Sequence, residues 1–211
     1  MKLPGTLPRP RLSAATSVLT LVVLAAFSHN VFANPGQGEE MISNQNGPAT
    51  SKTLEVVVTR VFQAPVEQVW KAWSDSKEVM RWWGPTGFSS PVARIDFRVG
   101  GVSLVCMRAP KEFGGQDMYS TWTYVKIEPL QRIEYIFHFT DKEGNRIEPA
   151  TMGVPPGVPN GVPHVITFKR LAENKTEMTI TESGYTSETA VTISKMGLEQ
   201  CLDKMAASFK S

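Results

Sequence analysis

Residues 61–85 read VFQAPVEQVWKAWSDSKEVMRWWGP, and this stretch decides how the rest of the chain is interpreted. Pro65 suits the first turn of a helix, because the first N–H groups of a helix have no intrahelical partner and proline lacks that group. Valine and tryptophan then recur at helical spacing. Asp75 can cap a second short helix, which Gly84-Pro85 ends. The stretch therefore predicts two consecutive short helices.

Strand-like segments lie on both sides of these helices. Thr53 to Phe62 alternates apolar and polar residues and is rich in valine, which predicts a first strand. Six further strands are expected at Pro91–Arg98, Val102–Arg108, Gln116–Glu128, Gln131–Thr140, Pro163–Arg170 and Lys175–Ser183. Residues 187–209 carry one apolar stripe, which predicts a long amphipathic helix. The stripe consists of Ile193, Met196, Gly197, Cys201, Met205 and Phe209.

The order of these elements indicates the fold class. Strands joined by hairpins and followed by a helix are typical of α+β proteins with an antiparallel sheet, not of doubly wound parallel sheets. A sheet with one apolar face needs a cover, and only the last helix is long enough to supply it. We therefore expect a helix-grip fold: a seven-stranded antiparallel sheet wrapped around a long C-terminal helix, with two short helices after the first strand.

Four short motifs follow one another in the order of a known family. They are Arg81-Trp82-Trp83-Gly84-Pro85, Phe97-Arg98-Val99-Gly100-Gly101, Ile127-Glu128-Pro129 and the helix start at Gly197–Met205. In these motifs the chain resembles the START-like (SRPBCC) superfamily, and within it the proteins named after the activator of the heat-shock chaperone ATPase. The resemblance covers about residues 53–210 and implies the helix-grip fold. It leaves the activity open, since the superfamily includes polyketide cyclases, ligand carriers and chaperone co-factors.

Two departures from the family pattern lie in the last helix. Leu198 stands where the family usually has tryptophan, and Cys201 stands where it usually has serine. If both positions face the groove between sheet and helix, they enlarge or soften that side of it.

The first 33 residues have the pattern of a secretory signal peptide. Three positive charges and no negative charge precede an uncharged, mostly apolar run from Leu12 to Phe27. This run is shorter than the ~20 residues that span a bilayer. Val31 and Ala33 are small enough for the −3 and −1 positions of a signal-peptidase site. We therefore expect cleavage after Ala33 and a periplasmic or secreted mature protein.

The remaining chain divides into a tether and one domain. Residues 34–52 are rich in Gly, Asn, Gln, Pro and Ser, which predicts a disordered tether, and the domain follows over 53–210. Removing residues 1–33 changes the net charge from +2 to −1. A nearly neutral protein has no electrostatic reason to bind nucleic acid or acidic lipid. We expect neither partner, nor membrane insertion once the signal is removed.

The two cysteines, Cys106 and Cys201, lie in apolar stretches far apart in the sequence. An exported protein can oxidise such a pair, but two cysteines are too few for a disulfide scaffold. Two buried thiols are the favoured interpretation, and one disulfide is the alternative.

Side chains with catalytic or metal-binding potential are few. His138 alternates with apolar neighbours and is expected to face solvent. His164 begins a strand, either as a polar contact at a cavity rim or as an ordinary strand-edge histidine. Asp96 is expected to form a salt bridge with Arg98. The sequence contains no metal-ligand spacing, nucleophile elbow or phosphate loop, so it predicts no catalytic residue, no metal and no cofactor.

Large aromatic residues and methionines are the positive signal for function. Most of them are expected in the core, but one helix cannot fill the space beneath a large sheet. An apolar pocket with a few polar groups is the usual small-molecule site. The expected ligand-binding residues are Phe97, Met107, Trp122, Phe137, His164 and Met196.

The segment from Thr140 to Pro163 is long and rich in proline and glycine. A connection of this length without secondary structure is usually functional or disordered. Either a mobile flap over the pocket mouth or an inert surface excursion fits this composition. Val154, Val158 and Val162 recur every fourth residue and are apolar groups suited to a bound molecule.

These observations favour an exported protein that binds a small hydrophobic or amphipathic ligand between its sheet and its C-terminal helix. The alternative is a cyclase or lyase that uses the same pocket and one polar group, His164 or Tyr124. The third hypothesis is a chaperone ATPase co-factor. It conflicts with the export signal, because that chaperone uses ATP inside the cell.

Overall fold

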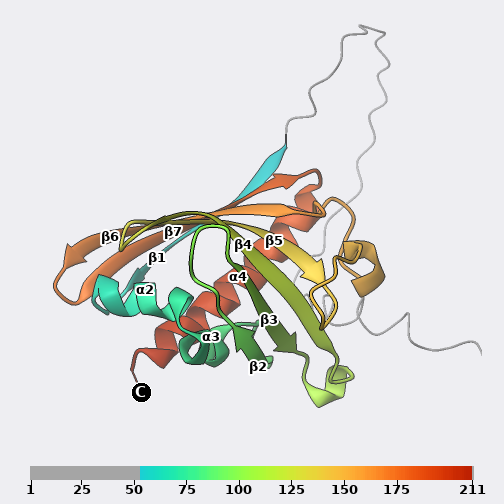
Figure 1. The fold of residues 1–211 in the computed structure, drawn as a ribbon, viewed down its shortest axis with the longest axis horizontal. Helices are drawn as coiled ribbons and strands as arrows, with labels where there is room; N and C mark the ends of the chain where they lie inside the picture. The colour runs from blue at the N-terminus through green and yellow to red at the C-terminus, as the bar shows by residue number, and fades with distance from the viewer. Residues whose placement is uncertain (1–52, 211) are drawn as a thin grey trace, which may run out of the picture.

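The computed structural model describes residues 53–210. They form a seven-stranded antiparallel sheet, two short helices, one long helix and two short 3-10 segments (Figure 1). The expected signal peptide (1–33) and tether (34–52) lie outside the described residues.

The strands and helices follow the expected order along the chain. The strands are β1 (Leu54–Phe62), β2 (Ser89–Arg94), β3 (Val102–Arg108), β4 (Asp117–Glu128), β5 (Arg132–Thr140), β6 (Val162–Ala172) and β7 (Lys175–Tyr185). The helices are α2 (Val66–Ser74), α3 (Ser76–Trp82) and α4 (Glu188–Ser208), and the 3-10 segments are η3 (Lys111–Phe113) and η4 (Pro149–Met152).

The strand order in the sheet is β1-β7-β6-β5-β4-β3-β2, and all neighbours are antiparallel. Every strand therefore pairs with its neighbour in sequence, except that β1 pairs with β7. α4 runs along one face of the curved sheet and packs against β1, β7 and α3 (Figure 1). The predicted helix-grip architecture is confirmed. The second strand ends at Arg94 rather than Arg98, because beyond Arg94 the backbone N–H groups have other partners: Asp96 donates to the Ser103 hydroxyl at 3.0 Å, and Arg98 donates to the Asp96 carbonyl at 2.9 Å.

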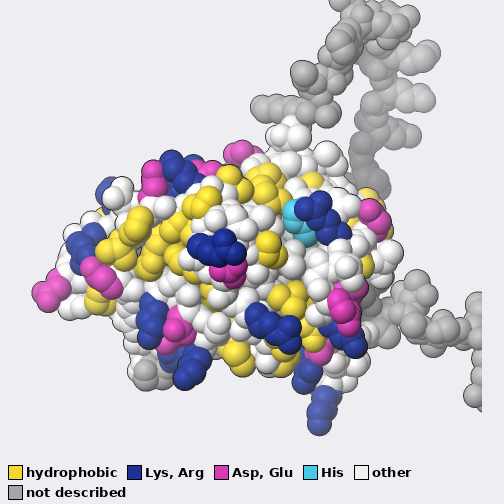
Figure 2. All heavy atoms as spheres, in the orientation of Figure 1, with side chains coloured by type: hydrophobic (Ala, Val, Ile, Leu, Met, Phe, Trp, Pro, Cys, Tyr) yellow, Lys and Arg dark blue, Asp and Glu magenta, His cyan; other side chains and the backbone are white. Residues whose placement is uncertain are grey.

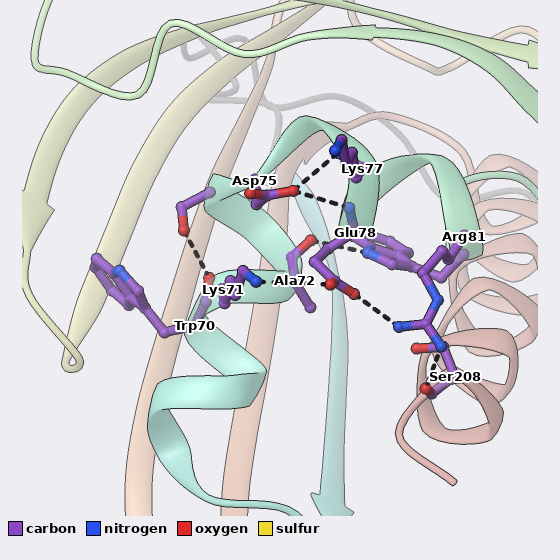
Figure 3. Close-up of polar contacts among 10 residues, drawn as sticks. Trp70, Lys71, Ala72, Asp75, Lys77, Glu78, Arg81 and Ser208 are labelled. Atoms are coloured by element: carbon purple, nitrogen blue, oxygen red, sulfur yellow. Dashed lines mark hydrogen bonds and ion pairs between the residues drawn. The ribbon is translucent and has the colours of Figure 1, made fainter. Parts of the chain in front are cut away.

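The junction of the two short helices is held by Asp75, as its position in the sequence predicts (Figure 3). Its Oδ1 accepts hydrogen bonds from the backbone N–H groups of Lys77 at 2.9 Å and Glu78 at 3.2 Å. The indole N–H of Trp82 donates to the carbonyl of Ala72 at 2.9 Å, which ties α3 back to α2. These bonds fix the helix pair as one unit.

An aromatic cluster fills the space between this helix pair and the sheet. The centroid of the Trp73 ring lies 4.6 Å from that of the Trp82 ring and 5.9 Å from that of the Trp122 ring. Trp122 in turn stacks on Tyr135 at 5.2 Å and meets Trp83 edge-on at 4.9 Å. Such edge and offset contacts stabilise a core beyond the area they bury. This half of the inner face of the sheet is therefore packed with side chains.

The prediction that His138 faces solvent is wrong, although its strand parity is as expected. His138 lies on the face of β5 opposite to Phe137, but it is only 7% exposed. The segment after β5 folds back over this face. A Cβ built on Gly161 would lie 3.0 Å from Nε2 of His138. Burial, with a smaller contribution from Arg146, lowers the pKa of His138 below its usual range.

The segment between β5 and β6 has more structure than its composition suggests. A bridge joins Thr140 to Arg146, and η4 follows at Pro149–Met152. Further along, the carbonyl of Gly157 accepts a hydrogen bond from the N–H of Thr186 at 2.9 Å, just before α4 begins. The segment is thus attached to both the sheet and the N-terminus of α4.

The described surface carries both signs of charge. On the face that Figure 2 shows, Lys and Arg side chains alternate with Asp and Glu side chains, and hydrophobic side chains lie between them. Among the helices of residues 53–210, none has the length and apolar character needed to cross a membrane.

Candidate functional site

A cavity of about 450 Å³ lies beside the aromatic cluster, and Trp83 of that cluster is part of its lining. Its walls come from the inner face of the sheet, one side of α4, the turn after α3 and the segment that follows β5. Most of the lining is apolar, with a few polar side chains, which is the usual make-up of a small-molecule site. The apolar side chains that line it include Phe88, Met107, Met118, Phe137, Phe139, Val154, Val158, Val162, Ile193, Met196 and Leu198.

The structure brings four of the six expected ligand-binding residues to this cavity: Met107, Phe137, His164 and Met196. The other two belong to the packed core. Phe97 lies outside β2, with its ring 5.5 Å from Trp70 and 5.1 Å from Tyr124. Trp122 is fully buried between the short helices and the sheet.

Both departures from the family pattern face the cavity. Leu198 and Cys201 lie in its wall, so the condition under which they enlarge or soften the groove is met. Cys106 and Cys201 are free thiols, and both are buried. Burial raises the pKa of Cys201 to about 12, which keeps this thiol neutral and poorly nucleophilic.

A buried polar cluster stands in the otherwise apolar wall. His164 on β6 and Glu182 on β7 are paired directly across the two strands, and both line the cavity. Nε2 of His164 lies 3.1 Å from Oε1 of Glu182, and the hydroxyl of Tyr185 donates to Oε2 of Glu182 at 2.6 Å. The Tyr135 ring stacks on the imidazole at 4.6 Å. His164 and Glu182 are 6% and 7% exposed, so this contact is shielded from bulk water.

Both ring nitrogens of His164 have polar partners. Nδ1 lies 2.9 Å from the carbonyl oxygen of Val162, and Nε2 lies 3.1 Å from Oε1 of Glu182. The imidazole is therefore held from both sides, and it occupies one acceptor position of Oε1.

Tyr185 completes the cluster because of a bulge in β7. Leu54 pairs with Tyr185 while the next residue, Glu55, pairs with Ser183, so Gly184 is left without a partner. Gly184 has a φ of 93°, a conformation that glycine adopts without strain. The extra residue turns Tyr185 to the same face as Glu182. Burial, and next the charge of Glu182, raise the pKa of this phenol far above its usual range.

The sequence analysis missed Glu182 and Tyr185. Glu182 carried a signal, since it continues the alternation of Thr176, Met178 and Ile180, which face the core. An acidic residue at the end of such a row is a buried polar group that needs partners. Tyr185 carried no comparable signal, because the bulge breaks the alternation on which strand faces are predicted.

Other polar groups contribute less to the site. The salt bridge of Asp96 with Arg98 is confirmed at 3.0 Å, on the surface. Tyr124, considered as a catalytic group, is absent from the cavity lining and bonds to the hydroxyl of Ser103 at 3.1 Å. Within residues 53–210, no three histidine, cysteine or carboxylate side chains are grouped as a metal site would need. The arrangement can enclose an apolar molecule and offer it the polar cluster of His164, Glu182 and Tyr185. Trp83 Nε1 and Ser120 Oγ, which have no hydrogen-bond partner among the described residues, belong to residues of the same wall.

Comparisons with known proteins agree with this architecture. The family model described as Activator of Hsp90 ATPase homolog 1-like protein matches residues 63–210. A protein from Chromobacterium violaceum, solved by X-ray crystallography, is 27% identical with a TM-score of 0.59, and the match covers 72% of this chain and 94% of that one. No curated protein matches the chain.

Two more distant structures share the fold. A protein from Arthrobacter aurescens, solved by NMR, is 23% identical with a TM-score of 0.57, over 77% of this chain and 88% of that one. The AHSA1 protein from Silicibacter pomeroyi is 16% identical with a TM-score of 0.60, over 74% of this chain and 98% of that one.

Proposed function

The chain belongs to the family of Activator of Hsp90 ATPase homolog 1-like proteins, and from this premise we propose that it is an exported binding protein for a small hydrophobic or amphipathic molecule. The observation that carries the proposal is the cavity of about 450 Å³ between the sheet and α4, with its mostly apolar lining. Its volume lies within the range of about 300–1,000 Å³ that is typical of ligand pockets.

A fluorescence titration tests binding. N-phenyl-1-naphthylamine is a neutral apolar dye whose emission rises when it leaves water, and we expect the domain to bind it. Leu198→Trp should weaken this binding at least about tenfold, because the larger side chain occupies the cavity. Lys195→Trp is the matched control, since Lys195 is exposed on the same helix and should leave the affinity unchanged. Equal affinity of both variants would place the dye elsewhere and contradict the proposal.

Export is the second part of the proposal, and it rests on the sequence of residues 1–33. Cell fractionation should find the protein outside the cytoplasm, and N-terminal sequencing should begin at Asn34. A protein that keeps Met1 would refute the export signal. Native mass spectrometry of the protein from its own host would identify molecules that co-purify with it.

An enzyme of the cyclase or lyase type is the second candidate function. The observation in its favour is the 3.1 Å contact between Nε2 of His164 and Oε1 of Glu182 in the cavity wall, since an imidazole and a carboxyl group are the side chains most often used for proton transfer. Product analysis after incubation with the co-purified ligand separates the two functions. Turnover that Glu182→Gln abolishes supports the enzyme, and affinity without turnover supports the binding protein.

A further inference from the structure

We propose, as a deepening of the binding function above, that the ligand is a neutral amphipathic molecule whose hydroxyl group donates a hydrogen bond to Glu182. The same site discriminates against carboxylates, so it takes an alcohol or a phenol in preference to a fatty acid. The proposal depends on the hydrogen bonds of Glu182, on the charges of the lining and on the apolar remainder of the wall.

Glu182 has hydrogen-bonding capacity that its protein partners do not use. A carboxylate offers about four lone-pair sites. One bond reaches each oxygen: His164 faces Oε1, and Tyr185 donates to Oε2. Each oxygen keeps a further acceptor position, and the side chain lines the cavity. Tyr185 cannot donate a second hydrogen bond to Glu182, because its single O–H hydrogen already points at Oε2. A hydroxyl hydrogen of the ligand would meet the remaining acceptor.

The charges of the lining select a neutral ligand. His164 and Glu182 are the only side chains of the types Asp, Glu, Lys, Arg and His that line the cavity in the described part of the chain. No Lys or Arg side chain of residues 53–210 lines the cavity, so a ligand carboxylate would enter a mostly apolar space without such a cationic partner, which is costly. An ammonium group would find a single carboxyl group, which His164 and Tyr185 already contact. A carboxylate would in addition face the acceptor oxygens of Glu182.

The rest of the wall defines the body of the ligand. Met107, Met118 and Phe137 line it from the sheet, and Val154 and Met196 line it from the other sides. Methionine side chains adjust to differently shaped apolar groups. The cavity therefore fixes one polar end of the ligand and tolerates variation in its apolar part.

A matched set of probes tests the proposal by displacement of N-phenyl-1-naphthylamine. The probes are decan-1-ol, its methyl ether and decanoate, which share one chain and differ in the polar end. We expect wild-type protein to bind the alcohol about tenfold more tightly than the ether, because only the alcohol can donate a hydrogen bond to Glu182. The affinity for decanoate should be at least about tenfold lower than the affinity for the alcohol.

Two substitutions assign the effect to Glu182. Glu182→Met removes both acceptor oxygens at similar length, and should make the affinities for alcohol and ether equal within about twofold. Glu182→Gln keeps an acceptor and adds a donor, so it should retain part of the alcohol preference and increase decanoate binding about tenfold. Glu177→Gln is the control, because Glu177 lies on the outer face of the same strand and should change nothing.

The outcomes separate this inference from the binding function. If wild-type protein binds dye and ether but does not prefer the alcohol, the hydroxyl assignment is overturned and the binding function stands. A preference that persists in Glu182→Met would overturn the role of Glu182. If Glu182→Met fails to fold, the decanoate affinity of Glu182→Gln decides, and no gain contradicts the proposal. Failure of wild-type protein to bind any of the four compounds contradicts the binding function itself.

Discussion

The ammonium group of Lys204, in α4, donates a hydrogen bond to the carbonyl oxygen of Gly84 at 2.8 Å. The same group donates to the carbonyl of Phe88, also at 2.8 Å. One side chain therefore ties the turn after α3 to the long helix. Pro85 and Phe88 of this turn line the cavity, so Lys204 positions part of the cavity wall although its own side chain is not in the lining.

Lys204→Met should destabilise the protein by about 1–2 kcal/mol, because it leaves two partly buried carbonyl groups without a donor. Urea unfolding followed by circular dichroism measures the change. Lys195→Met on the exposed side of the same helix is the control and should be nearly neutral. An equal effect of both substitutions would show that the bonds to the turn contribute nothing.

Trp83→Ala should cost about 3–5 kcal/mol of unfolding free energy, as truncation of a buried tryptophan usually does. The Trp83 ring is 8% exposed and lies 4.9 Å from Trp122 and 5.6 Å from Trp82. Met80→Ala, at an exposed position of α3, the helix that Trp83 follows directly, should cost less than about 1 kcal/mol. A melting temperature of Trp83→Ala within a degree or two of wild type would refute the structural role.

The fold was predictable from the sequence because it depends on local patterns. Asp75 was recognised as a cap and does cap α3, and strand alternation identified the inner faces. The position of the cavity was harder to predict from the sequence. Phe97 has the expected apolar character, but β2 ends before it, and the side chain turns toward Trp70. Trp122 faces inward as expected, yet the short helices fill the space above it.

The polar cluster shows a second limit of sequence reasoning. The bulge at Gly184 reverses the parity of Tyr185, and the pairing of His164 with Glu182 depends on the register of two strands. The burial of His138 depends on the path of the segment after β5. Strand register, the bulge and the path of this segment are set by tertiary contacts, so burial here does not follow the local alternation from which it is predicted.

The two glycines at Gly197 and Gly157 should respond in opposite ways to alanine. Gly197 lies inside α4 with its nearest neighbour 3.9 Å from a built Cβ, so Gly197→Ala should stabilise by about 0.5–1 kcal/mol. Gly157 has a φ of 101°, and its Cβ would lie 2.4 Å from the Cβ of Ser187. Gly157→Ala should destabilise by about 2 kcal/mol.

Gly157→Ala should also release N-phenyl-1-naphthylamine faster, because it detaches the cavity-lining segment from the start of α4. Thermal melts and stopped-flow dilution measure the two effects. Unchanged release kinetics in a folded Gly157→Ala protein would support the inert-excursion interpretation of this segment.

His138 should make the protein sensitive to mild acid. Its pKa in the folded state lies below the ordinary value of 6.5, chiefly because of burial, so the unfolded chain binds the proton first. The contribution that His138 makes to the free energy of unfolding is fully present above pH 6.5, and it is lost as the pH falls through the folded-state pKa of His138. His138→Gln should flatten the unfolding free energy between about pH 7 and pH 5. A curve of unchanged slope in this variant would assign the acid sensitivity to other groups.

Both cysteines should resist alkylation in the folded protein. Burial raises the pKa of Cys106 to about 11 and that of Cys201 to about 12, so little thiolate exists at pH 8. Mass spectrometry after treatment with iodoacetamide should find no adduct on native protein and adducts on both cysteines in guanidinium. Rapid modification of the native protein, or a disulfide in the non-reduced protein, would contradict this prediction.

The pairing of β1 with β7 constrains when the domain can complete its folding. Thr59 and Thr179 share a side-chain hydrogen bond at 2.8 Å although they are 120 residues apart in the sequence. Contacts between such distant segments form slowly, because a long loop must close before they contribute. β1 has no partner in the sheet until β7 is available, because β7 is the strand with which it pairs. The pairing that completes the sheet therefore closes a loop of about the whole domain, so it should be among the last steps of folding.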